Sequence, residues 1–454
     1  MSAKAKSPLL ISAILSVIFI GIITCVSCGE DNVPYNTKYI DQFHSLTTKS
    51  EGLNITPDNL SLFVDYSNCI AKAMQSPFYQ CMVSPLTAAT KHYWSIKGDV
   101  ISEEAGSVYS LLNHVEETDY AALDKAIEQM ANCSGESVML TDGELFTKNA
   151  AKNNPNNPYM HAAFKQWLLK GHDIHILAEP YLETYKGQKF NKKRFYIIFT
   201  DDRMPGNIFD RITELVDFEE FPEIDTFHLS GNYPWIVPTN EGKSHLNDMI
   251  VADITHRGAY EIQDWQIDWE NITNLITYAT DTITGELLPN GDKLIDGLHI
   301  NRNAFGCYRI KDIEVRVSNI NHDYFNLYNM LEADTQIDHL AISPIPVEEF
   351  LIYDVEEFNR HGNVDLYFDV NNFAPFGVLD GKPFNYLKIE IAVKSLDNIL
   401  NNNIDIFNFD SVVNHGQTNV SISESLKNCV FDPDLINKLS ETVLYTIYVK
   451  SDKY

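Results

Sequence analysis

The sequence predicts an α/β N-terminal domain with a doubly wound, mostly parallel sheet, followed by a β-rich, β-sandwich-like C-terminal region. Between residues 58 and 218, short apolar runs alternate with amphipathic helical stretches, a rhythm typical of βα units. After about residue 220 this rhythm is lost, and short segments of alternating apolar and polar residues dominate. At 454 residues the chain exceeds one ordinary core, so several domains are expected.

The N-terminal segment predicts export. Lys4 and Lys6 precede the apolar stretch 8–24, and small residues and cysteines follow it in CVSCGEDN. Basic, apolar and small residues in this order are typical of a signal peptide, which we assign to residues 1–27. An uncleaved membrane anchor is the alternative, because the apolar run nearly reaches the length of a membrane-spanning helix.

A cysteine directly after the apolar stretch resembles the lipobox of bacterial lipoproteins, in which this cysteine is acylated. Cys28 follows Ser27 and fits better than Cys25, but the position three before Cys28 holds Cys25 where the family usually has Leu, so the choice stays open. GEDN after Cys28 resembles the surface-export signal of lipoproteins of the Bacteroidetes group. The resemblance implies a lipid anchor in the outer membrane and display on the cell surface, with a periplasm-facing position as the alternative.

The predicted elements of the α/β domain follow in order along the chain. Four apolar runs are expected to be strands: Leu60–Val64, Ser137–Leu140, Asp173–Ala178 and Arg194–Thr200. Five amphipathic stretches are expected to be helices: Ser67–Gln75, Glu104–His114, Tyr120–Ala131, Tyr159–Lys170 and Asn207–Leu215. Gly171 is a typical C-cap for the fourth helix.

The C-terminal half contains alternating segments at Asp312–Val317, Leu387–Val393 and Val443–Val449, with turns such as PNGD between them. One elaborate sandwich or two smaller domains fit this pattern, with a possible seam near 328–339. The expected divisions are a signal peptide (1–27), a polar tether (28–57), an α/β domain (58–218), a β-rich domain (219–330) and a sandwich-like domain (331–454).

The formal net charge is −29, from 34 basic and 63 acidic residues. Such a surface repels phosphate backbones, so nucleic acid is not an expected partner. Five cysteines lie beyond the anchor: Cys69, Cys81, Cys133, Cys307 and Cys429. Their odd number and their lack of paired spacing argue against a disulfide framework, and a single disulfide within the first domain is the alternative.

Hydroxyl and carboxylate side chains follow strands of the α/β domain. Asp65 and Ser67 end the first apolar run, Thr118 precedes a helix, and Asp142 ends the strand VMLT. Because loops at the carboxyl ends of parallel strands converge on one crevice, we expect these groups to meet. Their oxygens suit a hard cation such as Mg²⁺.

This order of D-x-S, a threonine before a helix and T-D-G after a strand resembles the von Willebrand factor A domain and its metal-ion-dependent adhesion site. The resemblance implies a Rossmann-like fold over residues 58–218, with Asp65 and Ser67 in the first metal loop, Thr118 in the second and Asp142 in the third. An acidic side chain of a protein partner usually completes the metal shell. The family's second serine is Cys69 here, whose sulfur Mg²⁺ disfavours. Two nearby acids, Glu116 and Glu117, could instead favour Ca²⁺ or Mn²⁺, or simply solvate the loop.

Other candidates are weaker. Strand alternation places His172 and His175 on opposite faces, so we expect no shared metal, with one ring exposed and the other packed. Asp201 and Asp202 either border the same crevice or cap the following helix. The aromatic residues of the β half are expected to fill the core rather than form a ligand platform: Tyr233, Trp235, Trp265 and Trp269.

The favoured interpretation is an exported, lipid-anchored adhesion-type protein that binds a protein partner, and not an enzyme. No nucleophile elbow, H-E-x-x-H helix or P-loop is present, so no catalytic or nucleotide-binding residue is assigned. A metal-dependent hydrolase with Asp65 or Asp142 as base is one alternative. A metal-free structural component of a cell-envelope assembly is the other.

Overall fold

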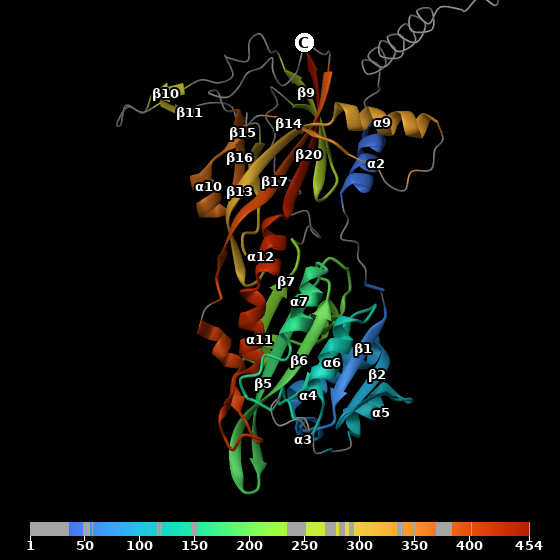
Figure 1. Ribbon diagram of the computed structural model, residues 1–454, viewed down its shortest axis with the longest axis vertical. Helices are drawn as coiled ribbons and strands as arrows, with labels where there is room; N and C mark the ends of the chain where they lie inside the picture. Colours follow the sequence, from blue (N-terminus) through green and yellow to red (C-terminus); the bar gives the residue numbers. More distant parts are fainter. Residues whose placement is uncertain are drawn as a thin grey trace, which may run out of the picture.

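The computed structural model describes residues 36–48, 55–56, 58–115, 118, 120–146, 153–233, 251–267, 278–280, 287–289, 295–333, 337, 340, 342–347, 351–368, 384–400 and 402–453. The predicted signal peptide (1–27), Cys28, Glu116, Glu117, Trp235 and Trp269 lie outside these residues, as does the side chain of Cys69. Two bodies are stacked along the long axis, one around a seven-stranded sheet and one around a six-stranded sheet (Figure 1).

The first body is built on a sheet of order β3-β2-β1-β4-β6-β5-β7. Its strands are β1 (Leu60–Asp65), β2 (Thr90–Lys97), β3 (Val100–Glu103), β4 (Ser137–Thr141), β5 (Asp173–Tyr185), β6 (Gln188–Thr200) and β7 (Asp225–Ser230). β1 pairs in parallel with β2 and β4, whereas the other neighbours pair antiparallel. The predicted α/β class is confirmed, but the mostly parallel sheet is wrong, because β5 and β6 form a tight hairpin that turns β6 against β4.

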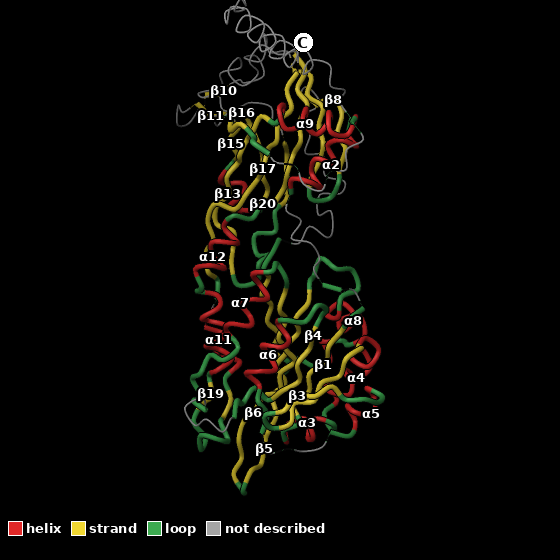
Figure 2. Tube along the Cα trace, turned by 45° about the vertical axis from the view of Figure 1, so that its right-hand side comes forward, coloured by secondary structure: helices red, strands yellow, loops and turns green. Residues whose placement is uncertain are grey.

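Helices cover both faces of this sheet (Figure 2). On one side lie α3 (Asn68–Ala73), α4 (Pro77–Ala89), α5 (Val108–Asn113) and α8 (Ile208–Leu215), and on the other α6 (Leu123–Ala131) and α7 (His161–Leu169). β1 is buried along its whole length because its side chains alternate between the two cores. Leu62 and Val64 join the α4 side, and Phe63 joins the α6 side.

The C-terminal part of the chain returns to complete the first body. It contributes η4 (Asn402–Phe407), β18 (Phe409–Asp410), β19 (Thr418–Asn419), α11 (Ser421–Val430) and α12 (Pro433–Ser440). α11 lies beside α7, where the backbone N–H of Met160 donates to the hydroxyl of Ser425 over 3.2 Å (Figure 1). The α/β unit therefore extends beyond the predicted range 58–218.

The second body is predominantly β, in agreement with the sequence pattern. Its main sheet has the order β14-β13-β17-β20-β9-β8 and contains β8 (Val251–His256), β9 (Tyr260–Ile267), β13 (Tyr308–Asn319), β14 (Ile345–Pro346), β17 (Phe384–Asn398) and β20 (Val443–Lys453). Smaller elements complete it: β10 (Tyr278–Thr280), β11 (Leu287–Pro289), β12 (Ile295–His299), β15 (Leu351–Tyr353), β16 (Asn363–Phe368), α9 (Asn321–Glu332) and α10 (Val355–His361), with η2 (Phe218–Glu220) before it.

The predicted boundary between residues 330 and 331 is wrong, because it cuts through this sheet. β13 pairs antiparallel with β17 along its whole length, and β9 pairs in parallel with β20. Both pairs join a strand from 219–330 to one from 331–454. The two predicted C-terminal domains therefore share one sheet.

Part of the predicted tether is folded. Residues Thr37–Thr47 form helix α2, which Asn36 caps by accepting a hydrogen bond from the backbone N–H of Lys38. Ile40 and Phe43 are buried in a cluster with residues of α9 and β20. The sequence 28–57 is polar on average, but these apolar side chains lie on one side of a helix and find a partner surface. Within the described part of the chain, no helix has the length and apolarity to cross a bilayer.

Candidate functional site

The structure brings the four predicted metal-site residues to the rim of one cavity. β1 and β4 are parallel neighbours, so Asp65 at the end of β1 and Asp142 just after β4 lie side by side. Ser67 and Thr118 form a parallel bridge next to them. All four line a cavity of about 650 Å³ at this end of the sheet.

Asp65 is buried and accepts hydrogen bonds through both of its carboxylate oxygens. Its Oδ1 accepts from the backbone N–H of Ser67 over 2.8 Å, and its Oδ2 accepts from Thr141 Oγ1 over 2.8 Å. Burial raises the pKa of Asp65 despite these bonds.

Thr118 is turned towards the backbone. Its Oγ1 donates to the carbonyl oxygen of Tyr66 over 3.1 Å and lies 3.3 Å from that of Tyr120. Its backbone N–H donates to the same Tyr66 oxygen over 2.7 Å. These bonds fix the loop that follows α5 against the end of β1.

A buried lysine that the sequence analysis missed compensates the charge at Asp142. The Lys192 side chain is 0% exposed, and its Nζ lies 3.2 Å from Asp142 Oδ2 and 2.5 Å from Glu144 Oε2. Burial raises the pKa of Asp142 to about 7, although the Lys192 ammonium acts in the opposite direction. Lys192 lies in the basic run KGQKFNKKR, whose composition is typical of an exposed segment and gives no sign of burial.

Glu144 ties the C-terminal segment to this cluster. Its Oε1 accepts from Ser411 Oγ over 2.5 Å and from the backbone N–H of Val413 over 3.0 Å. Its Oε2 accepts from the backbone N–H of Val412 over 3.2 Å. One wall of the cavity therefore comes from a segment that lies about 270 positions further along the chain.

The arrangement does not fit the divalent cation that the family resemblance implies at Asp65, Ser67, Thr118 and Asp142. Mg²⁺ needs several oxygen lone pairs in octahedral geometry. The two carboxylate oxygens of Asp65 already accept from Ser67 and Thr141, and Asp142 already faces an ammonium group. Lys192 thus supplies a positive charge at this cluster.

Asp201 and Asp202 do not border this cavity. They follow β6, which runs antiparallel to β4, so they lie at the opposite end of the sheet. Neither caps the following helix α8, because Asn207 does so by accepting from the backbone N–H of Asp210. Both predictions for these aspartates are therefore wrong.

His172 and His175 contact opposite faces of the sheet, as predicted. The ring of His172 lies 4.7 Å from that of Trp167 in α7, and His175 stacks on Phe209 in α8 at 3.7 Å. The expectation that one ring is exposed is wrong, because the two residues are 1% and 5% exposed. Each finds a carboxylate partner after β6: Asp201 for His172 and Asp202 for His175.

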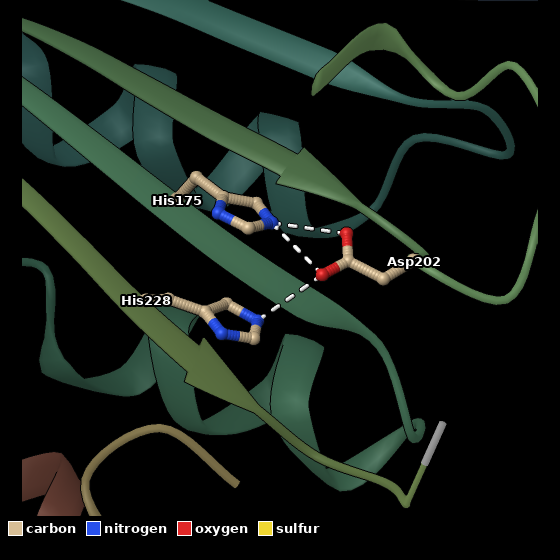
Figure 3. Close-up of side chains that lie close together, drawn as sticks. All are labelled: His175, Asp202 and His228. Atoms are coloured by element: carbon tan, nitrogen blue, oxygen red, sulfur yellow. Dashed lines mark hydrogen bonds and ion pairs between the residues drawn. The ribbon is translucent and has the colours of Figure 1, made fainter. Parts of the chain in front are cut away.

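His175 belongs to a second polar cluster that the sequence analysis did not find. His228 of β7 stands directly opposite it in the register, and both rings point to Asp202 (Figure 3). Burial alone would lower the pKa of His228, but hydrogen bonds with Asp173 and Asp202 raise it to about 9. The antiparallel pairing of β5 with β7 creates this cluster, so the cluster could be found from the sequence only if the strand order was predicted first.

The remaining predictions concern the core. Tyr233 and Trp265 are buried, as expected for core aromatics. Cys81, Cys133, Cys307 and Cys429 carry free thiols, so the possible disulfide does not form among them. Comparisons of the chain with protein-family models, with curated proteins and with solved structures give no significant match.

Proposed function

We propose that the chain is an exported, lipid-anchored binding protein that receives a basic side chain of a protein partner in the cavity at the carboxyl ends of β1 and β4. One observation carries this proposal, the excess of acidic over basic groups in the cavity lining. Four carboxylic acids line the cavity: Asp65, Asp142, Glu144 and Glu183. Lys186 is the lysine of the lining, and the ammonium group of Lys192 lies behind the lining against Asp142 and Glu144.

A cationic group that enters the cavity favours the ionised form of the acids whose pKa values burial raises, Asp65 and Asp142. Aromatic side chains in the lining add apolar surface and ring faces for the stem and head of a lysine or arginine: Tyr120, Phe146, Tyr185 and Phe190. At longer range, the net charge of −29 draws basic partners to the surface.

The cavity gives less support to the alternative of a hydrolase. Asp142, with a pKa of about 7, has the proton affinity of a general base. However, it is held by Lys192, and the described lining residues contain no nucleophile–base–orienter set. A cation-bridged adhesion site would select an acidic partner, whereas the charge of the lining favours a basic one.

The test compares two fluorescent peptides, one with a single arginine between leucines and one with glutamate in its place. We expect the arginine peptide to bind with no requirement for Mg²⁺, and Glu183→Gln and Asp142→Asn to weaken it. Glu356→Gln is the matched control, because Glu356 lies on α10 in the second body, in an exposed ion pair with Arg360. A preference for the glutamate peptide in Mg²⁺, or unchanged binding in both cavity variants, would refute the proposal.

A further inference from the structure

A cluster of two imidazoles and one carboxylate lies at the other end of the seven-stranded sheet (Figure 3). His175 Nε2 lies 2.9 Å and 3.1 Å from the two carboxylate oxygens of Asp202. His228 Nε2 lies 3.3 Å from Asp202 Oδ2. One ligand atom of each residue lies within 4.8 Å of the other two.

We propose that His175, Asp202 and His228 bind a divalent transition-metal ion of the Zn²⁺ class. Two imidazole nitrogens and a carboxylate oxygen are donors that Zn²⁺ favours, and a set of three protein ligands leaves the fourth tetrahedral position open. This site is separate from the acidic cavity and does not depend on the proposed function.

Two of the three ligands are already held in place. The His175 ring lies between Phe209, at a centroid distance of 3.7 Å, and His228, at 4.3 Å. Asp202 is fixed through its backbone N–H, which donates to Asp173 Oδ2 over 2.9 Å. Asp173 Oδ1 lies 3.1 Å from His228 Nε2, so a second carboxylate contacts the same ring nitrogen as Asp202.

The third ligand must turn for the ion to bind. The two rings are parallel to within 5°, so their nitrogen lone pairs point side by side rather than to one point. The side chain of His228 is 32% exposed, whereas the buried His175 ring is stacked on Phe209, so His228 is the ring that turns. The ion replaces the proton that His228 shares with the two aspartates, and its bonds replace the hydrogen bonds to Asp202.

The open position has an approach from a cavity. His175 and His228 form part of the lining of a space of about 590 Å³, together with apolar side chains of the η4 region such as Ile404. Gly306 borders the same space, and a side chain there would meet the carbonyl oxygen of His228 at 2.3 Å. The second body therefore closes tightly over β7 yet leaves room beside the imidazoles for water or a small ligand.

The experiment titrates the purified full chain with Zn²⁺ by calorimetry and with Co²⁺ by visible absorption, which reports tetrahedral coordination. We expect one strong site, and a loss of affinity of at least about tenfold in His228→Ala and in Asp202→Asn. His92→Ala is the matched control, because His92 also contacts a carboxylate, Glu103, at 2.6 Å but lacks a second imidazole.

Wild-type affinity in both cluster variants, or no binding by the wild-type chain, would overturn the proposal. If His228→Ala fails to fold, as judged by circular dichroism, Asp202→Asn decides the question on its own. A loss of affinity in His92→Ala equal to that in the cluster variants would also contradict the assignment, because it would indicate non-specific surface binding.

Discussion

Replacing Lys192 with methionine removes the ammonium group from its buried contacts with Asp142 and Glu144 and keeps a side chain of similar length. Removal of one partner of a buried ion pair costs about 3–5 kcal/mol. Protonation limits this loss, because neutralising an ordinary glutamic acid costs about 3.7 kcal/mol at pH 7 and about 1 kcal/mol at pH 5. We therefore expect Lys192→Met to lower the free energy of unfolding by about 3–4 kcal/mol at pH 7, and by much less at pH 5.

Urea unfolding followed by tryptophan fluorescence measures this change, since Trp167 is buried in the first body. Lys189→Met is the control, because Lys189 is an exposed lysine on the same strand and its loss should be close to neutral. In the double variant Lys192→Met/Glu144→Gln, part of the loss should be recovered, because one of the two uncompensated carboxylates is gone. Equal midpoints for Lys192→Met and Lys189→Met at pH 7 would show that Lys192 does not neutralise this cluster.

Three further results are expected. Burial lowers the pKa of His44 in α2 to about 4. The stability that depends on its neutral ring is therefore complete above about pH 6.5 and is lost as the pH falls to about 4. Over this range, acid titration should lower the free energy of unfolding of the wild type by up to about 3 kcal/mol more than that of His44→Gln. Gly143→Ala should lower the free energy of unfolding in urea by about 2–4 kcal/mol, because φ is +71° and the new methyl group would meet Ile422 at 2.6 Å. Gly187→Ala is the control: φ is +79° but no atom lies within 4 Å, so the free energy of unfolding should fall by no more than about 1–2 kcal/mol. Labelling of expressing cells with an alkyne fatty acid should mark the wild type but not Cys28→Ser, and equal labelling of both would refute acylation at Cys28.

The local features of the first body were accessible from sequence. β1 is a short, uninterrupted apolar run, and such a run is typical of a strand covered on both faces. The direction of β6 was missed although a signal was present. The segment between the apolar parts of β5 and β6 contains the turn Lys186–Gly187 and lacks a helical pattern. A parallel neighbour needs a crossover connection that is usually helical, and this segment has no helical pattern, so a hairpin was the better interpretation.

The site required long-range information that no local pattern contains. Lys192 is buried because the segment around Ser411 folds over it and delivers hydrogen-bond donors to Glu144. His175 and His228 meet because β7 joins the edge of the sheet next to β5. In both cases the chemistry depends on which distant segment packs against the residue. The apolar periodicity of a strand is the same whichever segment packs there, so it does not predict the contact.

The docking of α2 on the second body determines which end of the molecule a lipid anchor would hold. If Cys28 carries the lipid, seven residues separate it from Asn36, and a fully extended chain of this length reaches about 26–29 Å. The second body would then stand next to the bilayer, while the β5–β6 hairpin and the acidic cavity lie at the far tip of the elongated molecule (Figure 1). The second body would then hold the cavity away from the lipid headgroups, where a partner in solution can reach it.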